Sequence, residues 1–180
     1  MKLLWTTANE SNVAAVAMMN AQRALDMGVR NPAAAVFDID ETLLRNRGDD
    51  RVAVQPVGMK LFEFASAKGM DIYLVTARRK SKDSYEFAKK QLEALGYDLS
   101  NVKKIYMVSR AFDDDDDYGG RFKREARSRI AKTHSILINA GDRWSDLSAG
   151  GEPEDSAPSY AIVDPQEEGV LQGIKFPEID

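Results

Sequence analysis

Residues 33–42 read AAAVFDIDET, a short apolar run that ends in two aspartates and a threonine. An unbroken run of apolar side chains followed by a carboxylate is typical of a parallel strand buried on both faces. In open parallel sheets the ligand site lies beyond the carboxyl ends of the strands. This stretch therefore predicts a strand in the middle of an α/β sheet, with Asp38 and Asp40 at a site where that strand ends.

Predicted strands and helices alternate along the rest of the chain. Four further apolar runs have the length of strands: residues 70–75, 104–108, 136–140 and 160–163. Four segments have helical periodicity: residues 7–27, 57–68, 81–95 and 121–133. The alternation predicts an α/β fold, a Rossmann-like three-layer sandwich with a central parallel sheet of about five strands.

The ends of the chain are expected to belong to the same domain as its middle. Thr7 and Glu10 have capping-box spacing, which predicts that the first helix begins at Thr7. Residues 1–31 are expected to form a helical extension packed on a catalytic core of residues 33–177. No repeat or long linker divides the chain, so residues 1–180 are expected to form a single domain.

Composition restricts the chemistry that this chain can perform. It has 180 residues, a net charge of −4, no cysteine and a single histidine, His134. Disulfides, thiolate catalysis, Cys-ligated zinc and a His-rich metal site are therefore excluded. Catalysis must come from carboxylates, lysines, arginines and hydroxyls.

The sequence also gives expectations about location. The apolar stretch at the N-terminus is too short for a signal-peptide core. No run approaches the ~20 apolar residues of a membrane span. A cytoplasmic protein with no membrane partner is expected, and its oligomeric state is left open.

Polar residues follow the predicted strands where each strand ends. Residues 38–42 follow the first strand, and residues 76–78 (TAR) follow the second. Residues 141–142 (GD) follow the fourth strand, with Asp146 four positions later, and Lys123 lies near the start of the preceding helix. Each group alone is a weak signal, but all of them are expected at one edge of the sheet.

With these motifs the sequence resembles the haloacid dehalogenase (HAD) superfamily of phosphatases. Its four motifs match residues 38–42 (DIDET), Thr76, Lys123 and residues 141–146 (GDRWSD). The resemblance is closest to the acid-phosphatase branch, which includes plant vegetative storage proteins and bacterial class B and C acid phosphatases.

Three features of the sequence point to that branch. Residues 139–147 (NAGDRWSDL) are very similar to its last motif, Lys123 and Arg127 lie at the expected distance upstream, and residues 175–177 (KFP) resemble its closing segment. The resemblance covers residues 33–177.

The resemblance implies a magnesium-dependent phosphomonoester hydrolase that forms an aspartyl-phosphate on Asp38. A carboxylate nucleophile divides a slow hydrolysis into two steps, and Mg²⁺ offsets its repulsion of the anionic phosphate. The expected Mg²⁺ ligands are Asp38, the backbone carbonyl of Asp40, Asp142 and Asp146, the last directly or through water.

The remaining roles concern proton transfer and the negative charge of the phosphate. Asp40 is expected to protonate the leaving oxygen and later activate water. The residues expected to contact the phosphate are Thr42, Thr76, Ala77, Arg78 and Lys123. The expected catalytic residues are Asp38, Asp40, Thr76 and Lys123.

The substrate is expected to be a small phosphorylated molecule, and two alternatives stay open. One is a polynucleotide 3′-phosphatase on the same scaffold, which a basic groove with exposed aromatic residues would favour and the acidic net charge disfavours. The other is a phosphate-binding or storage protein with vestigial activity, against which the presence of both Asp38 and Asp40 weighs.

The short interval between Thr42 and Thr76 leaves no room for a large cap domain. Residues 47–50 (RGDD) form a turn signal, so residues 43–56 predict a small hairpin flap. A second acidic stretch, Asp113–Asp117, predicts a solvated loop, and residues 149–158 predict another loop before the last strand.

Overall fold

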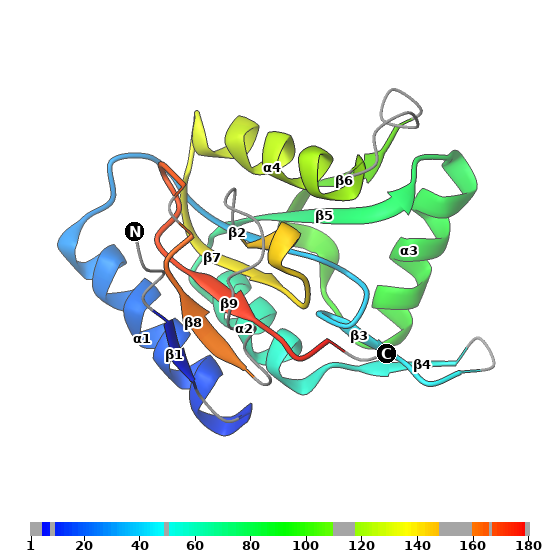
Figure 1. Ribbon diagram of the computed structural model, residues 1–180, viewed down its shortest axis with the longest axis horizontal. Coiled ribbons are helices and arrows are strands. Elements are labelled where there is room, and N and C mark those ends of the chain that lie inside the picture. The colour runs from blue at the N-terminus through cyan, green and yellow to red at the C-terminus, as the bar shows by residue number, and fades with distance from the viewer. Residues whose placement is uncertain are drawn as a thin grey trace.

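A computed structural model describes residues 5–7, 10–48, 51–109, 118–147, 160–165 and 167–178. It contains a seven-stranded sheet in the order β1-β8-β9-β7-β2-β5-β6 (Figure 1). The strands are β1 (Trp5–Thr7), β2 (Ala33–Phe37), β5 (Asp71–Arg79), β6 (Val102–Val108), β7 (Ser135–Gly141), β8 (Ala161–Val163) and β9 (Gly173–Lys175). The helices are α1 (Glu10–Met27), α2 (Pro56–Ala67), α3 (Lys82–Ala94) and α4 (Tyr118–Ala131), with the short 3₁₀ helices η1 (Leu99–Asn101) and η3 (Trp144–Asp146).

Five neighbouring strands, β9-β7-β2-β5-β6, are paired in parallel. Strand β2 lies in the middle, between β5 and β7, as the sequence predicts. The strand predicted at residues 160–163 is present as β8, but it runs antiparallel to β9. The fifth parallel strand is β9, which was not predicted because it has only three residues, including a glycine and a lysine.

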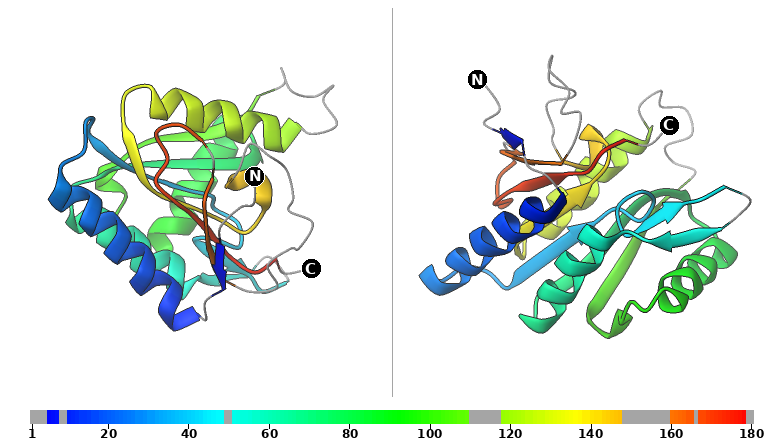
Figure 2. Two further views of the ribbon diagram at one scale, coloured as in Figure 1. Left: turned by 60° about the vertical axis from the view of Figure 1, so that its left-hand side comes forward. Right: turned by 90° about the horizontal axis from the view of Figure 1, so that it is seen from below.

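Helices cover both faces of the sheet, which confirms the predicted three-layer arrangement (Figure 2). Alternate residues of β2 point to opposite faces. Ala35 and Phe37 pack with α1, α2 and α3, whereas Ala34 and Val36 pack with α4. Because both faces are covered, β2 is apolar along its whole length, and its first polar residue, Asp38, comes where the strand ends.

Helix α1 begins at Glu10, so the predicted start at Thr7 is wrong. Thr7 belongs to β1, where it pairs with Ala161 of β8. Strand pairing at the sheet edge therefore overrides the capping-box spacing. Val13 and Ala17 of α1 are fully buried in the larger core cluster. The division into residues 1–31 and 33–177 stays a prediction.

The predicted flap is a two-stranded antiparallel sheet of β3 (Leu44–Asn46) and β4 (Val52–Val54). In the described part of the chain, this hairpin is the only module between Thr42 and α2. Asp113–Asp117 and residues 149–158, both predicted loops, lie outside the described residues.

Gly58 of α2 allows the loop after β2 to pack closely on that helix. A Cβ atom added at Gly58 would lie 1.9 Å from the backbone oxygen of Thr42. The loop itself has a left-handed residue, Glu41, with φ of +55°. Because such a conformation is strained for a side chain other than glycine, the surrounding packing must hold it. Gly58 is therefore part of what fixes the position of residues 38–42.

We expect Gly58→Ala to lower the free energy of unfolding by about 1–3 kcal/mol, the usual range for overpacking in a core. Gly119→Ala in α4 is the matched control, because its Cβ would meet only the Ala77 Cβ at 3.8 Å. Helix propensity alone should stabilise that variant by up to ~1 kcal/mol. Urea denaturation measures both variants, and equal effects would contradict the close-packing argument.

Candidate active site

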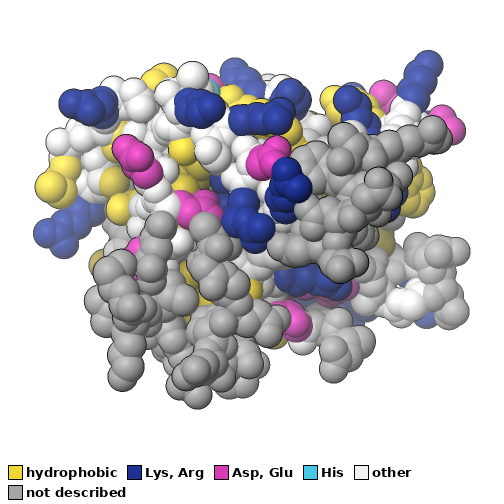
Figure 3. Space-filling view, turned by 45° about the horizontal axis from the view of Figure 1, so that its top comes forward, with side chains coloured by type: hydrophobic (Ala, Val, Ile, Leu, Met, Phe, Trp, Pro, Cys, Tyr) yellow, Lys and Arg dark blue, Asp and Glu magenta, His cyan; other side chains and the backbone are white. Residues whose placement is uncertain are grey.

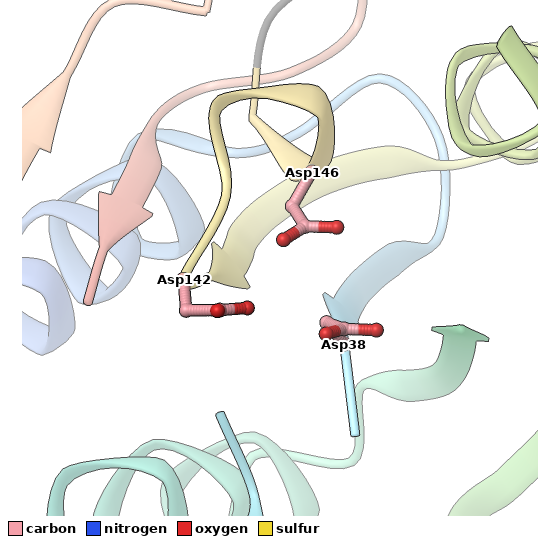
Figure 4. A group of neighbouring side chains, drawn as sticks. All are labelled: Asp38, Asp142 and Asp146. Carbon is pink, nitrogen blue, oxygen red and sulfur yellow. The ribbon is translucent and has the colours of Figure 1, made fainter. Parts of the chain in front are cut away.

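Three aspartates meet at the carboxyl edge of the sheet. Asp38 follows β2, Asp142 follows β7, and Asp146 ends η3. All three are buried, and one potential ligand atom from each lies within 4.8 Å of the others (Figure 4). This spacing is compatible with one ion that contacts both Asp38 and Asp142 at Mg²⁺–oxygen distances of ~2.1 Å.

The turn after β7 brings Asp146 back over the end of its own strand. Gly141 makes this possible, since a Cβ there would lie 2.2 Å from the Asp146 Cβ. The backbone N–H of Arg143 donates to Asp146 Oδ2 at 2.9 Å. Asn139 Nδ2 donates to the Asp146 carbonyl at 3.0 Å. The glycine and asparagine of the predicted motif are thus explained by the geometry of this turn.

Two buried cations hold the backbone of the aspartate loop. Arg127 donates to the carbonyls of Ser145 and Asp146 at 2.9 and 2.8 Å. It also forms a bidentate pair with Glu167 at 2.9 and 2.7 Å. Lys175 Nζ donates to the Asp142 carbonyl. Sequence reasoning noted Arg127 and Lys175 only as parts of a resemblance, and no local pattern indicated that their partners would be carbonyl groups.

Lys123 is the cation that faces the carboxylates. Its side chain is buried, and Nζ lies 3.2 Å from Asp38 Oδ1 and forms an ion pair with Asp146 Oδ1. Burial alone would lower the pKa of Lys123, but the nearby charges of Asp38 and Asp146 raise this pKa above its ordinary value. Lys123 is therefore a buried ammonium at neutral pH.

The cluster carries more negative charge than Lys123 balances. Burial raises the pKa of Asp38 well above its ordinary range. The charge of Lys123 lowers this pKa, and the charges of Asp146 and Asp142 raise it. Burial, with the charge of Asp146, raises the pKa of Asp142 to about 6. Asp38 Oδ1 has the Lys123 ammonium at 3.2 Å but, among the described residues, no hydrogen bond of good geometry. Three buried carboxylates beside one ammonium fit a divalent cation.

Asp40 lies outside this cluster and forms a bidentate pair with Arg78. Arg78 Nε and Nη2 donate to the two carboxylate oxygens of Asp40, both at 2.8 Å. Arg78 Nη1 donates to Gln91 Oε1 of α3 at 2.8 Å. The sequence predicted Asp40 and Arg78 as site residues but not their contact with each other, and it gave no signal for Gln91.

The other predicted phosphate contacts lie in the loops after β2 and within the end of β5. Thr42 is fully buried, and no described residue forms a hydrogen bond with its Oγ1 atom. Thr76 is also buried, and its Oγ1 accepts a hydrogen bond from the backbone N–H of Arg78 at 3.2 Å. Ala77 is exposed. Their predicted contacts with phosphate stay predictions.

A comparison with protein families matches residues 46–178 to the HAD superfamily, subfamily IIIB (acid phosphatase). The chain belongs to this acid phosphatase family. The resemblance drawn from the motifs is thereby confirmed. The matched region includes Lys123, Asp142 and Asp146 but begins after residues 38–42, so the assignment of Asp38 and Asp40 depends on their placement at the end of β2.

Solved acid phosphatase structures share the fold. The class C acid phosphatase from Bacillus anthracis has 22% identity and a TM-score of 0.61, over 78% of this chain and 64% of that one. The same enzyme with tungstate bound has 21% identity and a TM-score of 0.59 over the same shares. The chain thus spans less than two thirds of these structures. No curated protein matches the sequence significantly.

Among the helices in the described residues, none has the length and hydropathy that a membrane span requires. The cytoplasmic location stays a prediction.

The raised pKa of Asp142 predicts how the metal-free protein responds to pH. The folded-state pKa of Asp142 is about 6, above the ordinary 3.8. The contribution of this group to the stability of the fold is therefore fully present below about pH 4 and is lost as pH rises through 6. In EDTA at pH 7.5, the free energy of unfolding of Asp142→Asn should therefore exceed that of wild type by on the order of 2–3 kcal/mol. At pH 4 the two proteins should differ little.

Denaturation with urea at the two pH values measures this difference, and Glu86→Gln, an exposed position on α3, is the control. The control should show no such dependence on pH. A stability difference between Asp142→Asn and wild type that is the same at pH 4 and pH 7.5 would contradict the argument.

Proposed function

We propose that this chain is a magnesium-dependent phosphomonoester hydrolase that works through an aspartyl-phosphate on Asp38. The observation that carries the proposal is the buried cluster of Asp38, Asp142 and Asp146 beside Lys123, in a chain of the acid phosphatase family. Small phosphorylated molecules are the proposed substrates. The tungstate bound to the Bacillus anthracis enzyme, an oxyanion like phosphate, supports the same class of ligand.

The carboxylates of Asp38, Asp142 and Asp146 and the backbone carbonyl of Asp40 would hold the ion. All are hard oxygen donors, which Mg²⁺ prefers in proteins. The ion, when bound, would offset the repulsion between Asp38 and the phosphate. Three carboxylates and one ammonium leave two negative charges, which supports a divalent rather than a monovalent ion.

In the first step, an oxygen of Asp38 attacks phosphorus while the bond from phosphorus to the leaving oxygen breaks. Asp40 gives its proton to that leaving oxygen. In the second step Asp40 takes a proton from water, the water oxygen attacks phosphorus, and Asp38 is released as a carboxylate. Lys123 balances charge on the phosphoryl oxygens in both steps, and Thr42, Thr76 and Ala77 contact them.

Arg78 is proposed to alternate between Asp40 and the phosphate. Its bidentate contact occupies both oxygens of the Asp40 carboxylate, the group proposed to transfer protons. A phosphate dianion is a competing partner for the same guanidinium. Its arrival would draw Arg78 away and leave Asp40 free to carry a proton, which reconciles the predicted phosphate contact of Arg78 with the pair described above.

The first test removes the nucleophile and the proton carrier separately. Asp38→Asn keeps the side-chain shape but removes the attacking anion, so hydrolysis of p-nitrophenyl phosphate should fall to background. Asp40→Asn removes proton transfer, worth typically ~10²–10⁴ in rate. The rate of Asp40→Asn should fall less on p-nitrophenyl phosphate, whose leaving group barely needs a proton, than on an alkyl phosphate.

Steady-state rates with Mg²⁺ and with EDTA measure both variants. Full activity in Asp38→Asn would place the nucleophile elsewhere. A wild-type protein inactive on every phosphoester would favour the phosphate-binding or storage alternative.

The second test loosens Arg78 without touching the phosphate site. Gln91→Leu removes the acceptor for Arg78 Nη1 and nearly conserves volume. We expect kcat for alkyl phosphates to fall by about 3–10-fold, because Asp40 is held less precisely, with a smaller change for p-nitrophenyl phosphate. Gln22→Leu on α1 is the same substitution away from the site and should have no effect. An equal loss on both substrates would argue against a role through Asp40.

A further inference from the structure

A groove with a volume of about 820 Å³ follows the outer edge of the sheet. Residues 103–107 of β6 and Ser109 form its floor, with the start of α3 on one side and α4 on the other. Along the seven residues of β6, at ~3.3 Å each, the groove extends roughly 20 Å. In the described residues β6 is the last strand of the sheet, so no other strand covers this edge.

The groove is basic although the chain as a whole carries a charge of −4. Its charged lining residues are Lys80, Lys82, Lys103, Lys104 and Arg129, with one carboxylate, Glu125. Figure 3 shows that Lys and Arg side chains are also spread over the neighbouring α4 face. The sign of the charge here is opposite to that of the whole molecule, which favours an anionic ligand.

Several of these cations are available to a ligand. Lys80 and Lys82 are exposed, and neither has a carboxylate partner among the described residues. Lys103 pairs with Asp71 at 3.3 Å across an exposed contact, and Lys104 Nζ lies 4.5 Å from the centre of the Tyr106 ring. Exposed pairs of this kind are weak and exchange readily for a stronger anion.

The groove begins beside the candidate active site. Lys80 follows Arg78 by two residues, and the groove residue Phe122 precedes Lys123 on α4. Strand β6 is two strands away from β2, roughly 10 Å at the usual strand spacing. A chain lying in the groove could therefore extend to Asp38 at its end.

We propose that this groove binds a short single-stranded nucleic acid whose terminal phosphate is the group hydrolysed at Asp38. The inference rests on the proposed function and adds an oligonucleotide to the small phosphorylated molecules proposed there as substrates. A row of cations follows the repeating phosphates of such a strand, and aromatic rings stack on bases without regard to sequence. Tyr85, 38% exposed, presents such a ring within the groove. The small hairpin flap suits a long substrate.

An acidic peptide is a less suitable occupant, because it would use the edge of β6 but has no need of aromatic rings. Lysines on an edge strand also prevent unwanted pairing between sheets. That role alone predicts no difference between a nucleotide and an oligonucleotide as substrate. The two occupants and the protective role can therefore be separated by experiment.

The test compares a deoxythymidine oligonucleotide of about ten residues, phosphorylated at its 3′ or 5′ end, with the matching mononucleotides. The groove variant is Lys82→Glu with Lys104→Glu. The control is Lys60→Glu with Lys90→Glu, two exposed lysines outside the groove with the same change of charge. Rates are measured with Mg²⁺, and binding of the fluorescent oligonucleotide is measured by anisotropy in EDTA, where turnover is stopped.

We expect wild type and the control to favour at least one oligonucleotide over its mononucleotide by about 10-fold or more in kcat/KM, an advantage that falls with added salt. The groove variant should lose this advantage and the binding, and should keep its rate on p-nitrophenyl phosphate. The proposal is overturned if the groove variant and the control variant have equal rates on the oligonucleotide and equal affinities for it. It is also overturned if polyglutamate displaces the fluorescent oligonucleotide more strongly than unlabelled oligonucleotide does. If wild type hydrolyses no phosphoester, the proposed function fails, and anisotropy alone still decides whether the groove binds.

Discussion

The structure depends on holding three buried carboxylates together against their mutual repulsion. Two like charges about 5 Å apart repel by roughly 3 kcal/mol at an effective dielectric constant near 20. Lys123 balances only part of this charge, since it is one ammonium beside three carboxylates and forms ion pairs with Asp38 and Asp146. Burial is the main cause of the raised pKa of Asp38 and of Asp142, and the neighbouring carboxylates raise both further.

The fold resists the repulsion through the backbone rather than through the carboxylates. Arg127 and Lys175 are both almost fully buried, yet they bind the carbonyl oxygens of the aspartate loop. Had either cation bound the carboxylate of Asp38, Asp142 or Asp146, it would have balanced the charge that a divalent ion is proposed to balance. The cations therefore fix the loop while the oxygens of Asp142 and Asp38 stay available, an arrangement that trades stability for function.

Local sequence predicted the strands that are buried on both faces and the side chains that follow them. Strand β2 and Asp38 were predicted because burial on both faces makes a run apolar, and the run ends where burial ends. Strands β1 and β9 were missed, since three-residue strands carry too little pattern. The pairing of Asp40 with Arg78, 38 positions apart, follows from the parallel contact of β2 with β5 and has no local signal.

In the proposed mechanism, the pairing of Asp40 with Arg78 would link recognition of charge to proton transfer. Arg78 is tied to α3 through Gln91, to Thr76 through its backbone, and to Asp40 through two hydrogen bonds. A neutral ligand could not compete with Asp40 for the guanidinium, whereas a phosphate dianion could. Asp40 would then be released to carry a proton only when a phosphate is present. Arg78 contacts Asp40 and precedes Lys80 of the basic groove by two residues, so an anionic strand that extends from the groove to the site would pass near it.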